Sequence, residues 1–116
     1  RKIELAIALE KAALATDPRI GVGRSTGFSD SVSYRVYANS HGFLEGYGSS
    51  SCYMSTQVVA RDENGMQTGG WASSSRSLAG LESPEKVGRI DAQRALRQLS
   101  PRSVPSQEVP VVFDQS

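Results

Sequence analysis

A single histidine and a single cysteine are the residues of this chain best suited to catalysis or metal binding. His41 lies in a turn, and a catalytic or metal-binding histidine needs at least one further histidine, cysteine or carboxylate close to it. The sequence places none there, so we expect His41 to be a solvent-exposed turn residue. We expect Cys52, at the start of a predicted strand, to be a small buried side chain. A reactive Cys52–His41 pair is the less favoured alternative.

Serine and glycine clusters raise two further possibilities, nucleophilic catalysis and phosphate binding. The runs Ser49–Ser51 and Ser73–Ser75 lack a G-x-S-x-G motif and a His–Asp partner set, so we expect them on the solvent face of a sheet. Residues Gly21–Gly23 lack the spacing and the strand–loop–helix context of a phosphate loop. We therefore predict no catalytic, cofactor-binding or metal-binding residue in this chain.

Two other features could lie at the surface. Trp71 could mark a contact surface, because aromatic residues are enriched at interfaces, although core packing is favoured. The second predicted helix has a basic fringe that is expected to be solvated, with some of its arginines paired with Glu85 or Asp91. The fringe consists of Arg89, Arg94, Arg97 and Arg102.

The composition is that of an ordinary soluble domain, with 116 residues, 38% apolar residues, 22% charged residues and a net charge of +1. The small charge argues against a nucleic-acid partner, which selects a strong basic excess, and against a membrane surface. A single cysteine excludes an intrachain disulfide and favours the cytoplasm. The chain lacks an initiating methionine, so we expect residues 1–116 to be one domain of a longer protein.

Hydrophobic periodicity predicts two helices. The first, at residues 2–15, has a wide apolar arc and is expected to be largely buried; Pro18 ends it. The second, at residues 83–99, begins with Ser83 as N-cap and Pro84 in the first turn. Its predicted inner face consists of Gly88, Ala92, Ala95, Leu96 and Leu99, and its predicted outer face of Arg89, Gln93 and Arg97.

Alternating apolar and polar residues between the helices predict antiparallel strands. They lie at residues 20–29, at 32–39, at 43–47 and 52–61 (one bent strand or two), and at 66–75. Glu63-Asn64-Gly65 predicts a tight hairpin with a type I′ turn. A short strand is expected at Val111–Phe113. The order is typical of an α+β fold, a largely antiparallel four-stranded meander with two helices on one face.

Three segments together resemble the TldD/PmbA family, in particular its PmbA (TldE-like) branch. They are ALEKAALATDPRI at 8–20, YANSHGFLEGYGSSSCYMSTQVVARDENGMQ at 37–67 and LESPEKVGRIDAQRALRQLSPRSVPSQEVPVVFD at 81–114. The most specific motifs are A-x-D-P-R-I, N-S-x-G-F, E-S-P-E-x-V-G, R-A-L-x-x-L-x-P-R and V-P-V-V-F. The chain resembles the middle region of these longer proteins.

The resemblance implies a cytoplasmic protein described as a modulator of DNA gyrase or as a metallopeptidase-related protein. It also implies a TldD-type partner in a heterodimeric peptidase, with a peptide substrate. The TldD branch carries an H-E-x-x-x-H metal motif, expected to bind zinc, after the segment equivalent to Val109–Asp114. The PmbA branch generally lacks it. This chain contains no such motif, so no catalytic or metal residue carries over to it.

The sequence therefore favours a non-catalytic structural and interaction domain of a metallopeptidase complex. The alternative is a stand-alone module that binds a peptide or protein at an exposed sheet edge. A self-contained cysteine or serine hydrolase is a weaker third possibility, resting only on Cys52 and His41.

Overall fold

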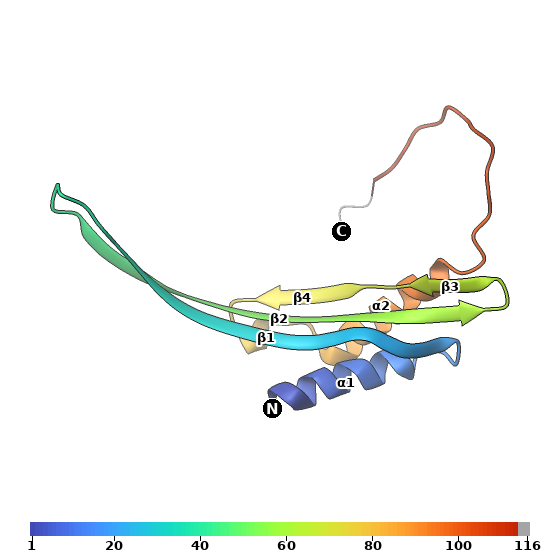
Figure 1. The fold of residues 1–116 in the computed structure, drawn as a ribbon, viewed down its shortest axis with the longest axis horizontal. Coiled ribbons are helices and arrows are strands. Elements are labelled where there is room, and N and C mark those ends of the chain that lie inside the picture. The colour runs from blue at the N-terminus through green and yellow to red at the C-terminus, as the bar shows by residue number, and fades with distance from the viewer. Residues whose placement is uncertain (114–116) are drawn as a thin grey trace.

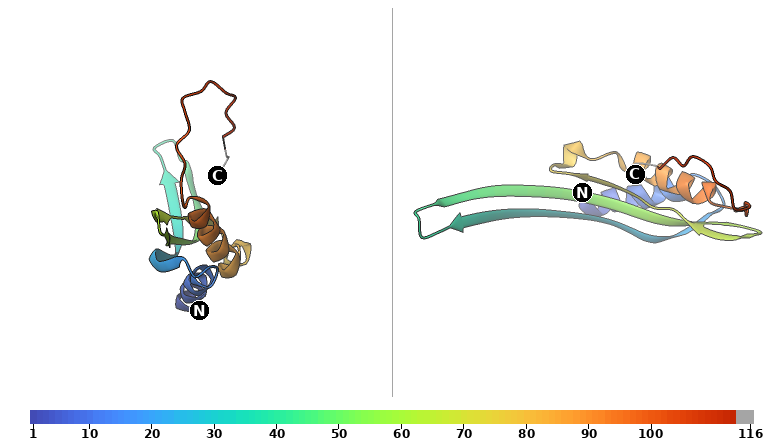
Figure 2. Two further views of the ribbon diagram at one scale, coloured as in Figure 1. Left: turned by 90° about the vertical axis from the view of Figure 1, so that its right-hand side faces the viewer. Right: turned by 90° about the horizontal axis from the view of Figure 1, so that it is seen from above.

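The computed structural model describes residues 1–113, with only the backbone of Val22, and has an α+β fold as predicted (Figure 1). The order is α1 (Lys2–Leu14), β1 (Ile20–Ala38), β2 (Leu44–Asp62), β3 (Gly65–Thr68), β4 (Trp71–Ser75), the short 3₁₀ helix η1 (Leu78–Gly80) and α2 (Pro84–Arg97). Both long helices cover one face of an antiparallel sheet, so the predicted layering is confirmed (Figure 2).

The sheet is built on β2, which pairs with β1 along one edge and with β3 and β4 along the other. The strands predicted at 20–29 and 32–39 form one strand, β1, and those at 43–47 and 52–61 form β2. The strand predicted at 66–75 is instead divided into β3 and β4, which lie in line along β2. The meander is therefore two long strands with two short ones on the far edge.

Gly69, which lies between β3 and β4, is packed against α2. A side chain at this position would collide with the backbone carbonyl and the carboxylate of Asp91 on α2. Only a glycine lets the helix approach the sheet this closely. The Gly69 amide still donates to the Val58 carbonyl at 2.9 Å, so the edge of β2 stays hydrogen-bonded through the break.

The turn between β2 and β3 lies where predicted but has a different type. The register pairs Asp62 with Gly65 and Val59 with Thr68, which makes the predicted tight hairpin. Gly65 has a φ of +146°, whereas Asn64 is not among the residues with positive φ. A type I′ turn needs positive φ at both central residues, so that part of the prediction is wrong. The Asn64 amide donates instead to the Asp62 carboxylate at 2.9 Å, which stabilises the turn.

The second helix follows the sequence closely. Its N-cap is Ser83, whose hydroxyl accepts a hydrogen bond from the Lys86 amide at 3.2 Å, as the pattern predicted. Gly88 is buried against α1, where a side chain would collide with the backbone of Leu9 and Ala13. Small residues thus bring the two helices close together.

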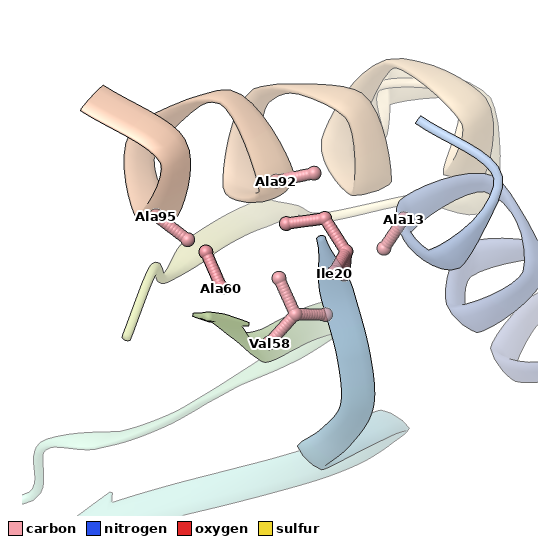
Figure 3. Packing of buried hydrophobic residues seen from close by; sticks show 6 residues of the cluster. All are labelled: Ala13, Ile20, Val58, Ala60, Ala92 and Ala95. Atoms are coloured by element: carbon pink, nitrogen blue, oxygen red, sulfur yellow. The ribbon is translucent and has the colours of Figure 1, made fainter. Parts of the chain in front are cut away.

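The core lies between the helices and the proximal part of the sheet. Figure 3 shows alanines from both helices pointing toward the sheet residues Ile20, Val58 and Ala60. A second cluster contains Leu9, Met54 and Val87, with Phe28, Trp71 and Leu81 packed beside it. The predicted inner face of α2 is confirmed at Gly88, Ala92 and Ala95, whereas Leu96 and Leu99 are only partly buried.

Two expectations about burial and strand formation are wrong. Helix α1 buries Leu9 and Ala13, but Ile3 and Ile7 on its outer side are exposed, because only one side of this helix meets α2 and the sheet. The strand expected at Val111–Phe113 does not form: residues 98–113 contain no helix or strand. Among the described residues, no sheet edge lies alongside that segment to supply the hydrogen bonds that a strand needs (Figure 1).

Candidate functional site

The dominant surface feature is the distal half of the β1–β2 hairpin, which stands clear of the helices (Figure 1). We call residues 31–51 the arm, and every one of them is exposed. Strand β4 ends its pairing at Cys52, so beyond that point the sheet has only two strands. The radius of gyration is 19.9 Å, whereas a compact domain of this length has about 13 Å. The arm and the C-terminal segment account for this extension.

The arm has two faces, and the first continues the surface that packs under the helices. Alternation along β2 places Cys52, Met54 and Thr56 in the core, and the even-numbered residues of the arm share their side. We call this the helix-side face; its members are Val32, Tyr34, Val36, Ala38, Leu44, Gly46, Gly48 and Ser50. It carries no charge, and Val32 is 85% exposed.

The helix-side face is shaped by glycine. Tyr34 lies over the opposite strand, and a side chain at Gly46 would collide with its ring. Glycines on one strand covered by an aromatic side chain from the next are a known device for holding a ribbon in register. The result is an apolar surface without a cover from the described residues, of the kind that marks interaction sites.

The second face, which we call the far face, is polar at its base and aromatic at its tip. At the base, cross-strand hydroxyl pairs join Ser31 to Ser51 at 2.9 Å and Ser33 to Ser49 at 2.7 Å. At the tip, the Tyr37 and Phe43 rings lie 5.7 Å apart. The tip also has a shallow hollow of about 490 Å³, whose lining includes Tyr47.

The predicted catalytic alternative, a Cys52–His41 pair, is excluded by this geometry. His41 lies in the turn at the tip of the arm and is exposed, whereas Cys52 is a buried free thiol at its base. The strand between the two positions spans roughly 25 Å. Asn39 explains the turn, because its side-chain oxygen accepts hydrogen bonds from the amides of His41 at 3.0 Å and Phe43 at 3.2 Å.

The serine runs have structural partners. Ser49 and Ser51 form the cross-strand pairs described above, and the Ser50 hydroxyl donates to the Arg76 carbonyl at 2.7 Å. Ser73 is buried, and its hydroxyl accepts from the Glu82 amide at 3.0 Å. Ser73 therefore departs from the predicted solvent face, because it faces the segment that leads into α2.

Trp71 is part of the packing rather than a free contact surface. Its ring is half-buried beside the second core cluster, and its Nε1 donates to Glu82 at 3.0 Å. The guanidinium of Arg94 lies 4.5 Å from the ring centroid, a cation–π arrangement. Core packing, which the sequence favoured, therefore describes Trp71 best.

The sequence predicted Asp91 on a solvated face beside the basic fringe, which is wrong, because this carboxylate is buried. Asp91 on α2 is fully buried, and neither of its oxygens has a hydrogen-bond partner among the described residues. Burial raises the pKa of Asp91 to about 6; the Thr56 hydroxyl and the Val58 amide oppose this rise from nearby, although neither meets the geometry of a hydrogen bond. The sequence did contain a signal for its burial, because Asp91 lies three residues after Gly88, on the predicted inner face of this helix.

The remaining charged motif near the start of β1 is structural. The Asp17 carboxylate accepts hydrogen bonds from the backbone amide, Nε and Nη2 of Arg19, all between 2.9 and 3.0 Å. These bonds hold the pKa of Asp17 at about 2. They fix the loop between α1 and β1, which gives the A-x-D-P-R-I segment a physical role.

Within residues 1–113, no three histidine, cysteine, aspartate or glutamate side chains come together as a metal site. Over the same residues, neither helix has the length and apolar character that a membrane crossing requires.

Comparisons with known proteins agree with the resemblance seen in the sequence. Residues 1–99 match the family described as the PmbA/TldA metallopeptidase central domain. Metalloprotease PmbA of Escherichia coli O157:H7 is 37% identical over 111 residues, which cover 96% of this chain and 25% of that protein. The Metalloprotease PmbA homolog of Haemophilus influenzae is 36% identical over 110 residues, or 95% and 24%. The chain thus spans about a quarter of these relatives, and it belongs to the PmbA/TldA metallopeptidase family, whose central domain it contains.

Proposed function

We propose that this domain is a non-catalytic structural and interaction domain of a PmbA/TldE-like subunit. The subunit would work with a TldD-type partner in a metallopeptidase complex that turns over peptides or proteins in the cytoplasm. The metal ion, expected to be zinc, would be held by the TldD-type partner.

The arm is the observation that supports this proposal. Its helix-side face continues the core surface of the sheet, is apolar and uncharged, and is uncovered within the described residues. A two-stranded ribbon is marginally stable alone in water. We therefore expect a long exposed ribbon to be stabilised by contact with another molecule. The exposed side of α1, including Ile3 and Ile7, is a second apolar surface of the same kind.

The proposal is tested in the full-length protein together with its TldD-type partner. Val32→Ser, Tyr34→Ser and Val36→Ser combined remove the apolar groups of the helix-side face without touching the core. We expect association with the partner to weaken at least about tenfold, since that corresponds to only about 1.4 kcal/mol, and peptide turnover to fall with it.

The matched control changes three exposed residues on the body, Arg89→Ser, Gln93→Ser and Arg97→Ser on α2. We expect this variant to assemble and to turn over peptide as the unmodified protein does. Undiminished assembly and turnover in the arm variant would refute the proposal.

The free edge of β1 favours a second candidate function, a stand-alone peptide- or protein-binding module. Over the described residues β1 pairs only with β2, so its outer edge is open to strand addition. This module would bind an extended peptide when no TldD-type subunit is present. Peptide titration of the full-length protein alone distinguishes the two candidates, because the subunit proposal expects no binding under that condition.

A further inference from the structure

The far face of the arm tip carries one charge of each sign, and neither is neutralised. Arg35 on β1 and Glu45 on β2 are both exposed. Neither forms an ion pair with any of the described residues, whose ion pairs all lie outside the arm tip. Tyr37 and Tyr47 complete the face, because the register places Arg35 opposite Tyr47 and Tyr37 opposite Glu45.

This arrangement has a local symmetry. In an antiparallel ribbon, a two-fold axis through the Val36–Gly46 pair exchanges the two strands. That rotation places Arg35 on Glu45 and Tyr37 on Tyr47. The rotation thus exchanges one tyrosine with the other, and it exchanges the positive charge with the negative charge.

We propose that the far face of the arm tip binds the far face of the same arm in a second copy of this chain. When two such faces meet with the arms crossed, each Arg35 meets Glu45 of the second copy. The contact is isologous, so both ion pairs form at once. The tyrosines meet near the axis, where aromatic residues contribute most to interfaces.

Charge is the reason to prefer a second copy over another partner. A face of one sign would repel its own copy, whereas this face has the two signs on a diagonal that self-association brings together. The shallow hollow lined by Tyr37, Phe43 and Tyr47 gives a side chain of the second copy a place to enter. The contact uses the far face only, so it goes beyond the proposed function, which rests on the helix-side face.

Charge reversal tests the pairing in the full-length protein without a TldD-type subunit. Sedimentation velocity measures self-association at concentrations on the order of 1–100 µM, because so small a contact gives a weak dimer. We expect Arg35→Glu to weaken dimerisation at least about tenfold, since it places two like-charged pairs in contact. We expect Glu45→Arg to do the same.

The restoring combinations distinguish this contact from any other. Both an equimolar mixture of the two single variants and the double variant Arg35→Glu/Glu45→Arg recreate opposite-charge pairs across the contact. We expect each to dimerise within about threefold of the unmodified protein, the tolerance left by non-additivity between neighbouring residues. Arg24→Glu, on β1 outside the arm and also exposed, is the matched control and should have no effect.

Three results would overturn the proposal: an unmodified protein that stays monomeric over this range, single reversals that dimerise normally, or restoring combinations that stay dissociated. All the changed side chains are exposed, and circular dichroism verifies that each variant is folded. The proposed function is tested separately, by the association of the helix-side variants with the TldD-type subunit, so its failure would be distinguishable from the failure of this proposal.

Discussion

The two halves of the β1–β2 hairpin have the same alternating pattern but differ in what covers them. In the proximal half, two helices cover one face, and Val58 is fully buried. In the arm, the equivalent face is bare, and Val32 is 85% exposed. The same residue type in the same ribbon therefore stabilises the fold in one half and is free to contact another molecule in the other.

The largest expected effect lies in the proximal half. Val58→Ala should lower the free energy of unfolding by about 2–4 kcal/mol, because it removes buried methyl groups and leaves a cavity under the helices. Urea unfolding of the domain measures this loss. A change below about 0.5 kcal/mol would mean that the core is not where Figure 3 shows it.

The next effect depends on pH and concerns Asp91. Its pKa is raised from 3.8 to about 6 in the folded state, so folding favours the protonated carboxyl. The contribution of the protonated Asp91 carboxyl to the free energy of unfolding is fully present below about pH 4. It is lost as the pH rises through about 6. The loss is about 2–3 kcal/mol, since one pKa unit corresponds to about 1.4 kcal/mol.

Asp91→Asn isolates this contribution, because asparagine cannot ionise. Unfolding measured from pH 4 to pH 8 should show a fall in stability for the unmodified domain that the variant lacks. Asp30→Asn, at an exposed position, is the control and should keep the fall. Parallel pH profiles for the unmodified domain and the Asp91 variant would contradict the assignment.

The smallest expected effect on stability lies in the arm. Val32→Ala should change the free energy of unfolding by no more than about 0.5 kcal/mol, as surface substitutions do. The same urea unfolding experiment, with the Val58 variant as the reference, measures the difference. Equal losses from the two valines would show that the arm is covered by the domain itself.

The sequence predicted the elements well because their signals are local. Caps, periodicity and a turn glycine act within a few residues, so Ser83, Pro84 and Gly65 were assigned to the right places. Residues 20–38 were predicted as two strands, because the three glycines within 20–29 weaken the strand signal there. Here β2 runs alongside and supports most of that length.

The arm could not be predicted, because coverage is not a local property. Val32, Tyr34 and Val36 alternate with polar residues just as a half-buried strand does. A signal lay across the hairpin, where the residues paired with them are Ser50, Gly48 and Gly46. Because the residues opposite Val32, Tyr34 and Val36 are small, this face of the ribbon has too little apolar surface to form a core. Seeing this required the register, which depends on contacts between residues far apart in the sequence.

Hydrogen exchange of the full-length protein, alone and in the presence of the proposed TldD-type partner, tests most directly whether the helix-covered half stabilises the fold while the arm contacts another molecule. Dilute protein avoids self-association. We expect fast exchange in residues 31–51 of the free protein, slow exchange in the helix-covered half, and strong protection of residues 31–51 on binding. Unchanged exchange in the arm, with new protection confined to the helix-covered half, would contradict this expectation.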